Sequence, residues 1–107
     1  LKVTTKICRT ELRSADIFAR YGGDEFVVIL PMTDLAKTRE AAKRLCNALC
    51  SSAVEYNETR FNIRASFGVT SYRYDDTLEG MIKRADRSLY ISKNAGGNRV
   101  SGGEIND

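Results

Sequence analysis

The stretch Arg-Tyr-Gly-Gly-Asp-Glu-Phe at residues 20–26 places two carboxylates, Asp24 and Glu25, directly after two glycines, Gly22 and Gly23. Glycines allow a backbone with φ > 0, and their lack of a Cβ lets a bulky ligand lie close to the main chain. Carboxylates beside such a bare stretch suit Mg²⁺, which takes one or two of them together with waters and substrate phosphates. The pattern favours a site for a metal-bound nucleotide; the alternative is a tight turn whose acids face solvent.

The segments on either side of this stretch have the pattern of β-strands. Residues 16–21 precede the glycines, and the apolar run at 27–30 follows them. Pro31 ends the second segment because proline cannot donate a hydrogen bond to a strand ladder. Two such segments around a glycine pair are typical of a β-hairpin. We therefore expect Asp24 and Glu25 at or beside the hairpin tip.

Helical spacing of apolar residues appears in three regions. Residues 1–12 have it from the start, without a capping residue, so we expect the chain to begin inside a helix. A second helix is expected from a cap at position 33 or 34 to about residue 51, and a third from residues 75–77 to the stop signal at 94–97. The residues of the third helix expected to face a core are Leu78, Met81, Ile82, Ala85 and Leu89.

The remaining segments predict further strands. Residues 57–59 have the composition of a turn, and strict alternation of apolar and polar residues from Phe61 to Thr70 predicts one half-buried strand. Val100 is expected to start a last short strand. The order α-β-β-α-β-α-β indicates an α+β fold in which helices flank an antiparallel-rich sheet.

Composition limits the classes of function. The chain has 107 residues, 42% of them hydrophobic and 29% charged, which indicates one globular domain. A net charge of +3, with the basic residues dispersed, does not favour a nucleic-acid partner, and no apolar run approaches the ~20 residues of a membrane span. Three cysteines without any histidine exclude the usual zinc ligand sets and a Cys-His nucleophile. We expect a reduced, cytoplasmic protein in which this segment makes no membrane contact.

The heptapeptide at 20–26 resembles, letter for letter, the signature of the GGDEF family, the bacterial diguanylate cyclases. Residues 13–16, 65–69 and 85–93 resemble three further blocks of this family at the expected order and distance. The resemblance implies a palm-like fold related to nucleotidyl cyclases and polymerases. It also implies that a strand and helices precede Leu1, so that residues 1–107 are a single domain truncated at its N-terminus, about two thirds of the whole.

The reaction implied by the resemblance is condensation of two GTP molecules into cyclic di-GMP with release of pyrophosphate, on Mg²⁺ or alternatively Mn²⁺. It needs a homodimer, and a sensor domain is expected N-terminal to this segment. Asp24 and Glu25 would be metal ligands and catalytic residues, and Gly22 and Gly23 would make room for the nucleotide. Lys93 would contact the GTP phosphates, although the helix dipole also favours a lysine there.

One position departs from the family pattern. Gly97 stands where the family usually has a second phosphate-binding residue, an arginine, which weakens the case for triphosphate binding unless Arg99 or a residue outside this segment substitutes. The runner-up function is therefore a catalytically inactive GGDEF domain that binds cyclic di-GMP as a regulatory module.

A second site is implied upstream of the hairpin. Arg13 and Asp16 match the family's Arg-x-x-Asp inhibitory motif, and Arg44 falls where the family carries a supporting arginine. A guanidinium fork suits a guanine edge or a phosphate, and a carboxylate suits the guanine N–H groups. The resemblance implies that cyclic di-GMP binds here and inhibits the enzyme. The structural alternative is a surface ion pair at i, i+3 with an unrelated helix arginine.

Overall fold

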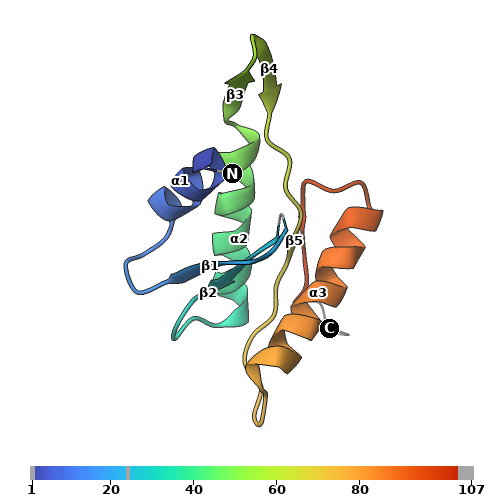
Figure 1. Ribbon diagram of the computed structural model, residues 1–107. Helices are drawn as coiled ribbons and strands as arrows, with labels where there is room; N and C mark the ends of the chain where they lie inside the picture. The colour runs from blue at the N-terminus through green and yellow to red at the C-terminus, as the bar shows by residue number, and fades with distance from the viewer. Residues whose placement is uncertain (1, 24, 104–107) are drawn as a thin grey trace.

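The computed structural model describes residues 2–23 and 25–103. Its helices and strands run in the following order (Figure 1): α1 (Lys2–Glu11), β1 (Ile17–Gly22), β2 (Glu25–Ile29), α2 (Leu35–Cys50), β3 (Ala53–Tyr56), β4 (Thr59–Asn62), β5 (Phe67–Gly68), α3 (Leu78–Asn94) and β6 (Val100–Ser101). This content confirms the α+β class. None of the helices within the described ranges is long and apolar enough to cross a membrane.

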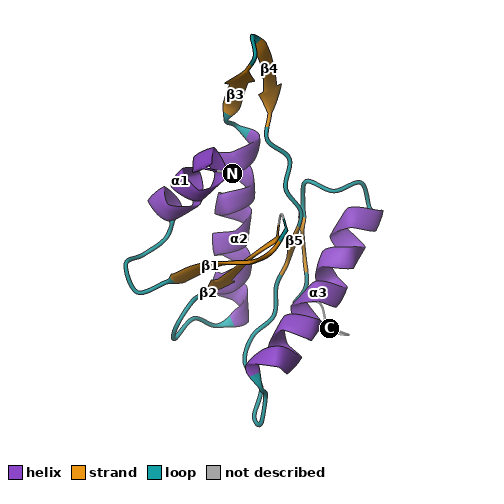
Figure 2. Cartoon of the chain, viewed as in Figure 1, coloured by secondary structure: helices purple, strands orange, loops and turns teal. Residues whose placement is uncertain are grey.

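The strands form three two-stranded sheets, two of them antiparallel (Figure 2). β1 and β2 make the expected hairpin, in which Ile17 lies opposite Ile29 and the register shifts between Arg20 and Gly22. β3 pairs with β4 in a second hairpin, which projects from the body of the molecule in Figure 1, and β5 pairs with β6 in parallel. The predicted predominance of antiparallel pairing is therefore confirmed.

The core lies between α1, α2 and the segment that leads into β5. Cys8, Leu45 and Leu49 are 4%, 3% and 2% exposed, and Phe18 of β1 packs against them. Asp34 caps α2, since its side chain accepts a hydrogen bond from the Lys37 amide at 2.8 Å. This cap and the buried face of α2 confirm the second predicted helix.

Helix α3 approaches β5 so closely that the strand needs a glycine there. A Cβ at Gly68 would overlap the Ala85 carbonyl oxygen and the Leu89 amide nitrogen, and it would lie 2.9 Å from the Leu89 Cα. These are backbone atoms, so a larger residue would push helix and strand apart. This close approach places α3 directly against the strand pair β5–β6.

Four of the five residues predicted to face the core from α3, Met81, Ile82, Ala85 and Leu89, are half-buried, but the fifth is not, and two serines are buried more deeply. Leu78, expected to face the core, is 58% exposed, whereas Ser88 and Ser92 are 2% and 0% exposed. The Ser92 hydroxyl donates to the Phe67 carbonyl oxygen at 2.8 Å and lies 2.6 Å from the Ser101 hydroxyl. Small polar side chains therefore join the helix to both strands of the parallel pair.

The single strand predicted from Phe61 to Thr70 is also wrong. β4 ends at Asn62, and β5 begins only at Phe67. Between them, the Ala65 amide donates to Oδ1 of Asn98 at 3.3 Å, and the Asn98 amide donates to the Ser66 hydroxyl at 3.2 Å. The partner of this segment is thus a loop asparagine rather than a neighbouring strand. β3, which pairs with β4, was not predicted.

Candidate functional site

The tip of the β1–β2 hairpin is open on the side that side chains would occupy. Apart from the residues adjoining each glycine, no heavy atom of the described residues lies within 4 Å of a Cβ built at Gly22 or Gly23. Arg20 stabilises the turn: its Nε and Nη2 donate to the Gly23 carbonyl oxygen at 3.0 and 2.6 Å. This arrangement leaves room for a ligand directly against the backbone of the glycine pair.

The carboxylates expected to bind a metal ion follow these glycines. Glu25 opens β2 opposite Gly22 and is half-buried, whereas Asp24 lies outside the described residues. Within the described ranges, no three histidine, cysteine or acidic side chains gather into a metal-binding group. A carboxylate beside open space and bare backbone fits Mg²⁺ or Mn²⁺, since these ions take few protein ligands and complete their shell with phosphate and water.

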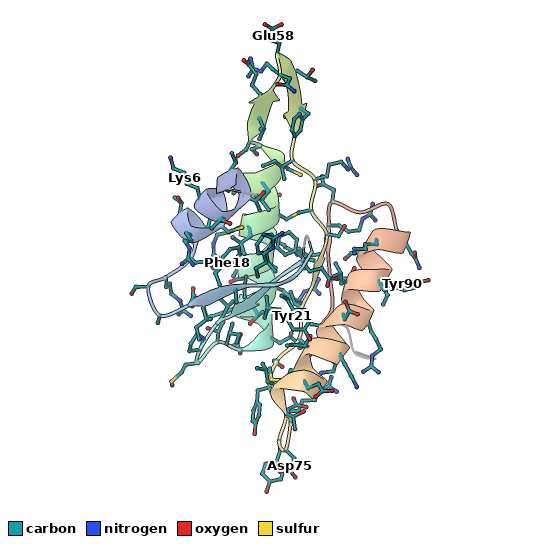
Figure 3. All side chains as sticks on the ribbon, in the orientation of Figure 1. Lys6, Phe18, Tyr21, Glu58, Asp75 and Tyr90 are labelled. Atoms are coloured by element: carbon teal, nitrogen blue, oxygen red, sulfur yellow. The ribbon has the colours of Figure 1, made fainter. Side chains whose placement is uncertain are left out.

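Residues of α3 face the hairpin near its tip. Tyr21 and four residues from the first part of α3 line a hollow of about 370 Å³. Tyr21 is 59% exposed, and Figure 3 shows its side chain between the hairpin and α3. The residues of α3 that line the hollow are Leu78, Glu79, Ile82 and Lys83. Tyr21 was not predicted as a site residue; its place directly before the glycines is the sequence signal that points to it.

Lys93 lies at the other end of α3. It belongs to the last turn of the helix, eleven residues after Ile82, and thus about 16 Å further along the axis at the usual rise per residue. No hydrogen bond or ion pair among the described residues joins Lys93 to the hairpin tip. A ligand that touched both would have to extend along α3.

The backbone after Lys93 accounts for the glycine at position 97. Gly97 has φ +72°, in the left-handed region, and a Cβ there would lie 3.1 Å from the Ser66 hydroxyl. An arginine at this position would therefore be strained in backbone and crowded at its side chain. The departure from the family pattern is built into the conformation of this loop.

Arg13 and Asp16 form a close ion pair at the start of β1. Nη2 and Nε of Arg13 donate to Oδ1 of Asp16 at 2.9 and 3.2 Å, and the Arg13 amide donates to Oδ2 at 2.9 Å. The hydrogen bonds from Arg13 hold the pKa of the Asp16 carboxyl below its usual range, and the charge of Arg44 lowers it further. Both arginines predicted for the inhibitory site therefore act on the Asp16 carboxylate.

Arg13 covers Asp16 and remains accessible itself. The Arg13 side chain is 61% exposed and that of Asp16 only 3%. Nη2 of Arg13 also donates to the Thr33 hydroxyl at 3.0 Å and to the Pro31 carbonyl oxygen at 3.3 Å. The arginine thus joins the start of β1 to the loop after β2. Thr33 was predicted only as a helix cap, and nothing in its sequence context indicates this contact.

The two predicted sites lie at opposite ends of β1. Asp16 precedes the strand and Gly22 ends it, which separates them by about 20 Å at the usual rise of a strand. No hydrogen bond or ion pair of the described residues connects the Arg13–Asp16 pair with the hairpin tip. One ligand at the tip and another at the pair can therefore be bound without sharing a contact.

Comparisons with known proteins identify the family of this chain. The family model described as diguanylate cyclase, GGDEF domain, matches residues 1–99. Diguanylate cyclase A from Treponema denticola is 36% identical over 102 residues, which cover 94% of this chain and 28% of that protein. Diguanylate cyclase DgcP from Pseudomonas aeruginosa is 37% identical over 100 residues, 94% of this chain and 15% of that protein.

A solved structure also has this fold. The crystal structure of diguanylate cyclase SiaD in complex with its activator SiaC, from Pseudomonas aeruginosa, matches with a TM-score of 0.87 and 29% identity. The match covers 92% of this chain and 38% of the other, so the chain spans less than half the length of these three relatives. With the family model matched over nearly all its residues, the chain belongs to the GGDEF family of diguanylate cyclase domains.

Proposed function

We propose that the protein containing this chain condenses two GTP molecules into cyclic di-GMP and releases two pyrophosphates. The observation that carries this proposal is the hairpin tip, where Gly22 and Gly23 leave open space beside the half-buried Glu25. The two relatives that are 36% and 37% identical to this chain are named diguanylate cyclases, which supports the same reaction here.

The reaction is attack of a ribose 3′-hydroxyl on an α-phosphate, so little covalent chemistry falls to side chains. Asp24 and Glu25 hold a divalent cation, Mg²⁺ or Mn²⁺, and Asp24 assists removal of the 3′-hydroxyl proton. When bound, such a cation neutralises the phosphate charge that builds up on attack and departure. Gly22 and Gly23 admit the nucleotide to the backbone, and Lys93 binds phosphate oxygens.

Catalysis requires two copies of the domain. Each hairpin holds one GTP, and each 3′-hydroxyl must reach the α-phosphate of the other GTP, so two domains face one another in a homodimer. We propose that a sensor domain outside this segment controls this encounter in the cytoplasm.

Product inhibition is assigned to Arg13, Asp16 and Arg44. The support is the ion pair at the start of β1, in which Arg13 is 61% exposed and covers the carboxylate. Cyclic di-GMP meets the guanidinium first, through a guanine edge or a phosphate, and the carboxylate then accepts guanine N–H groups. The location away from the hairpin tip suits control rather than chemistry.

A second candidate function is a domain that binds cyclic di-GMP without synthesising it. The observation that favours it is Gly97, whose left-handed backbone disfavours the arginine usual for the family. Such a domain would keep the Arg13 site and would lack turnover.

Turnover and binding measured on the same protein decide between the two. We would incubate a protein containing the intact domain with GTP and Mg²⁺ or Mn²⁺, with EDTA as the control, and quantify nucleotides by mass spectrometry. Metal-dependent formation of cyclic di-GMP supports the cyclase. Binding of added cyclic di-GMP without product formation supports the regulatory module. If the protein neither forms nor binds cyclic di-GMP, both candidate functions are overturned.

A further inference from the structure

Two arginines converge on the loop that follows α3. Nη2 of Arg64, which precedes β5, donates to the Gly96 carbonyl oxygen at 3.1 Å. Nε of Arg99 donates to the Gly97 carbonyl oxygen at 3.1 Å, and its Nη2 lies 3.2 Å from the position of a Cβ on Gly96. Both guanidinium groups therefore lie against Gly96, although the two arginines come from segments that are far apart in the sequence.

The corner that these arginines form carries positive charge without a compensating acid. Arg64 and Arg99 are both exposed, and neither forms an ion pair with a carboxylate within residues 2–23 and 25–103. Lys93, also exposed, belongs to the last turn of α3 directly before this loop. By contrast, Arg13 and Arg84 each have an aspartate partner. Two guanidinium groups at one loop, with a lysine in the adjoining helical turn, form a surface suited to an anionic ligand.

The loop backbone explains why no cation stands at position 97 itself. Gly96, Gly97 and Asn98 have φ of 112°, 72° and 57°, so three successive residues have positive φ. A Cβ on Gly97 would meet the Ser66 hydroxyl at 3.1 Å, which leaves little room for a long side chain at that position. The glycines instead present their carbonyl oxygens, and these orient the two arginines.

We propose that Arg64 and Arg99, beside Lys93, bind the phosphate groups of the nucleoside triphosphate and replace a cation at position 97. This inference rests on the proposed function. Each guanidinium has five N–H donors and uses few of them on a loop carbonyl, so donors remain for phosphate oxygens. The C-terminal end of a helix carries partial negative charge, which would repel phosphates unless such cations offset it.

Binding of inorganic tripolyphosphate and of GTP, each with Mg²⁺, tests this assignment by titration calorimetry. The variant is the double substitution Arg64→Gln and Arg99→Gln in a protein containing the intact domain. Its matched control is Arg60→Gln, because Arg60 is an exposed arginine on β4, in the projecting hairpin. We expect the affinity for both ligands to fall at least about tenfold in the double variant, and the KM for GTP to rise, while the control matches wild type.

A second variant separates charge from loop support. Arg64→Lys with Arg99→Lys keeps the charges but loses the planar donor fork, so it should retain part of the tripolyphosphate affinity that the glutamine variant loses. Thermal unfolding of every variant identifies any loss of folding. If the folded glutamine variant binds tripolyphosphate as wild type does, the arginines only support the loop, and the inference is overturned.

The outcomes also distinguish this inference from the proposed function. Normal GTP turnover that is unaffected by either double substitution would support the cyclase activity and reject phosphate binding by the two arginines. If the protein makes no cyclic di-GMP but binds tripolyphosphate through the arginines, the anion site is supported and the proposed cyclase activity is rejected. A wild-type protein that neither makes cyclic di-GMP nor binds tripolyphosphate would reject both proposals.

Discussion

Nη2 of Arg84 lies 2.6 Å from Oδ2 of Asp76, and Nη1 lies 3.1 Å from Oδ1, in a two-point ion pair whose side chains are 10% and 13% exposed. Arg84 also donates from Nε to the Thr70 hydroxyl and from Nη2 to the Ser71 carbonyl oxygen, both at 2.7 Å. One guanidinium therefore joins α3 to both ends of the segment that precedes it.

The first prediction concerns acid stability. Hydrogen bonds from Arg84, followed by one from the Arg73 amide, lower the pKa of Asp76 to about 2. Because this folded-state pKa lies below the unfolded value of about 3.9, the contribution to stability is present above about pH 4 and is lost as the pH falls through about 2. Asp76→Asn should therefore lower the free energy of unfolding at neutral pH and flatten its decline over that acidic range.

Denaturant titrations at a series of pH values measure this effect. Asp75→Asn is the matched control, since Asp75 is exposed and its left-handed backbone (φ 67°) is one that asparagine tolerates. Identical pH profiles for wild type and Asp76→Asn would show that the ion pair adds nothing to stability.

The second prediction concerns the contact between α3 and β5. Gly68→Ala would place a Cβ on top of the Ala85 carbonyl oxygen, so helix and strand would have to separate. We expect the free energy of unfolding to fall by about 1–3 kcal/mol, the usual cost of overpacking, as measured by chemical denaturation. Gly22→Ala is the control for stability, because no atom of the described residues other than those adjoining it lies within 4 Å of its Cβ position. Equal stability of wild type and Gly68→Ala would mean that the close approach is easily relieved.

Local patterns predicted the parts of this fold that local interactions determine. The hairpin follows from two apolar segments around the glycine pair, and α2 follows from its Asp34 cap and its apolar face. The strand predicted from Phe61 onward failed because its hydrogen-bond partners, the loop around Asn98 and the strand β6, are distant in sequence. Alternation of residues cannot indicate whether a neighbouring strand exists.

The contacts in the candidate sites also differ in whether they join residues that are near or distant in sequence. Arg13 and Asp16 are three residues apart, so their pairing could be predicted from spacing alone. The contact of Arg64 with Gly96 joins residues 32 positions apart, and no spacing rule indicates it. Tertiary packing brings such residues together, and only the structure identifies them.

The third prediction tests the proposed chemistry at the hairpin tip. Asp24→Asn should abolish formation of cyclic di-GMP while the fold is retained, because an amide keeps the shape of the side chain but loses the charge that holds a cation and accepts a proton. Product formation by mass spectrometry and circular dichroism are the two measurements. Asp75→Asn should keep normal turnover. Near-normal turnover of Asp24→Asn would make Asp24 a turn residue.

The last prediction separates control from chemistry. Arg13→Ala removes a charge-assisted, two-point contact, so we expect cyclic di-GMP affinity to fall about ten- to a hundredfold in titration calorimetry. Inhibition by accumulating product should weaken in parallel, whereas Arg60→Ala, which changes an exposed arginine on β4, should leave both unchanged. Asp16→Asn, which keeps the size of the side chain, should also weaken binding if the carboxylate accepts guanine N–H groups. Equal affinities for wild type and Arg13→Ala would mean that Arg13 and Asp16 only join the start of β1 to the loop at Thr33, and product inhibition would have to be assigned elsewhere even if the cyclase activity stands.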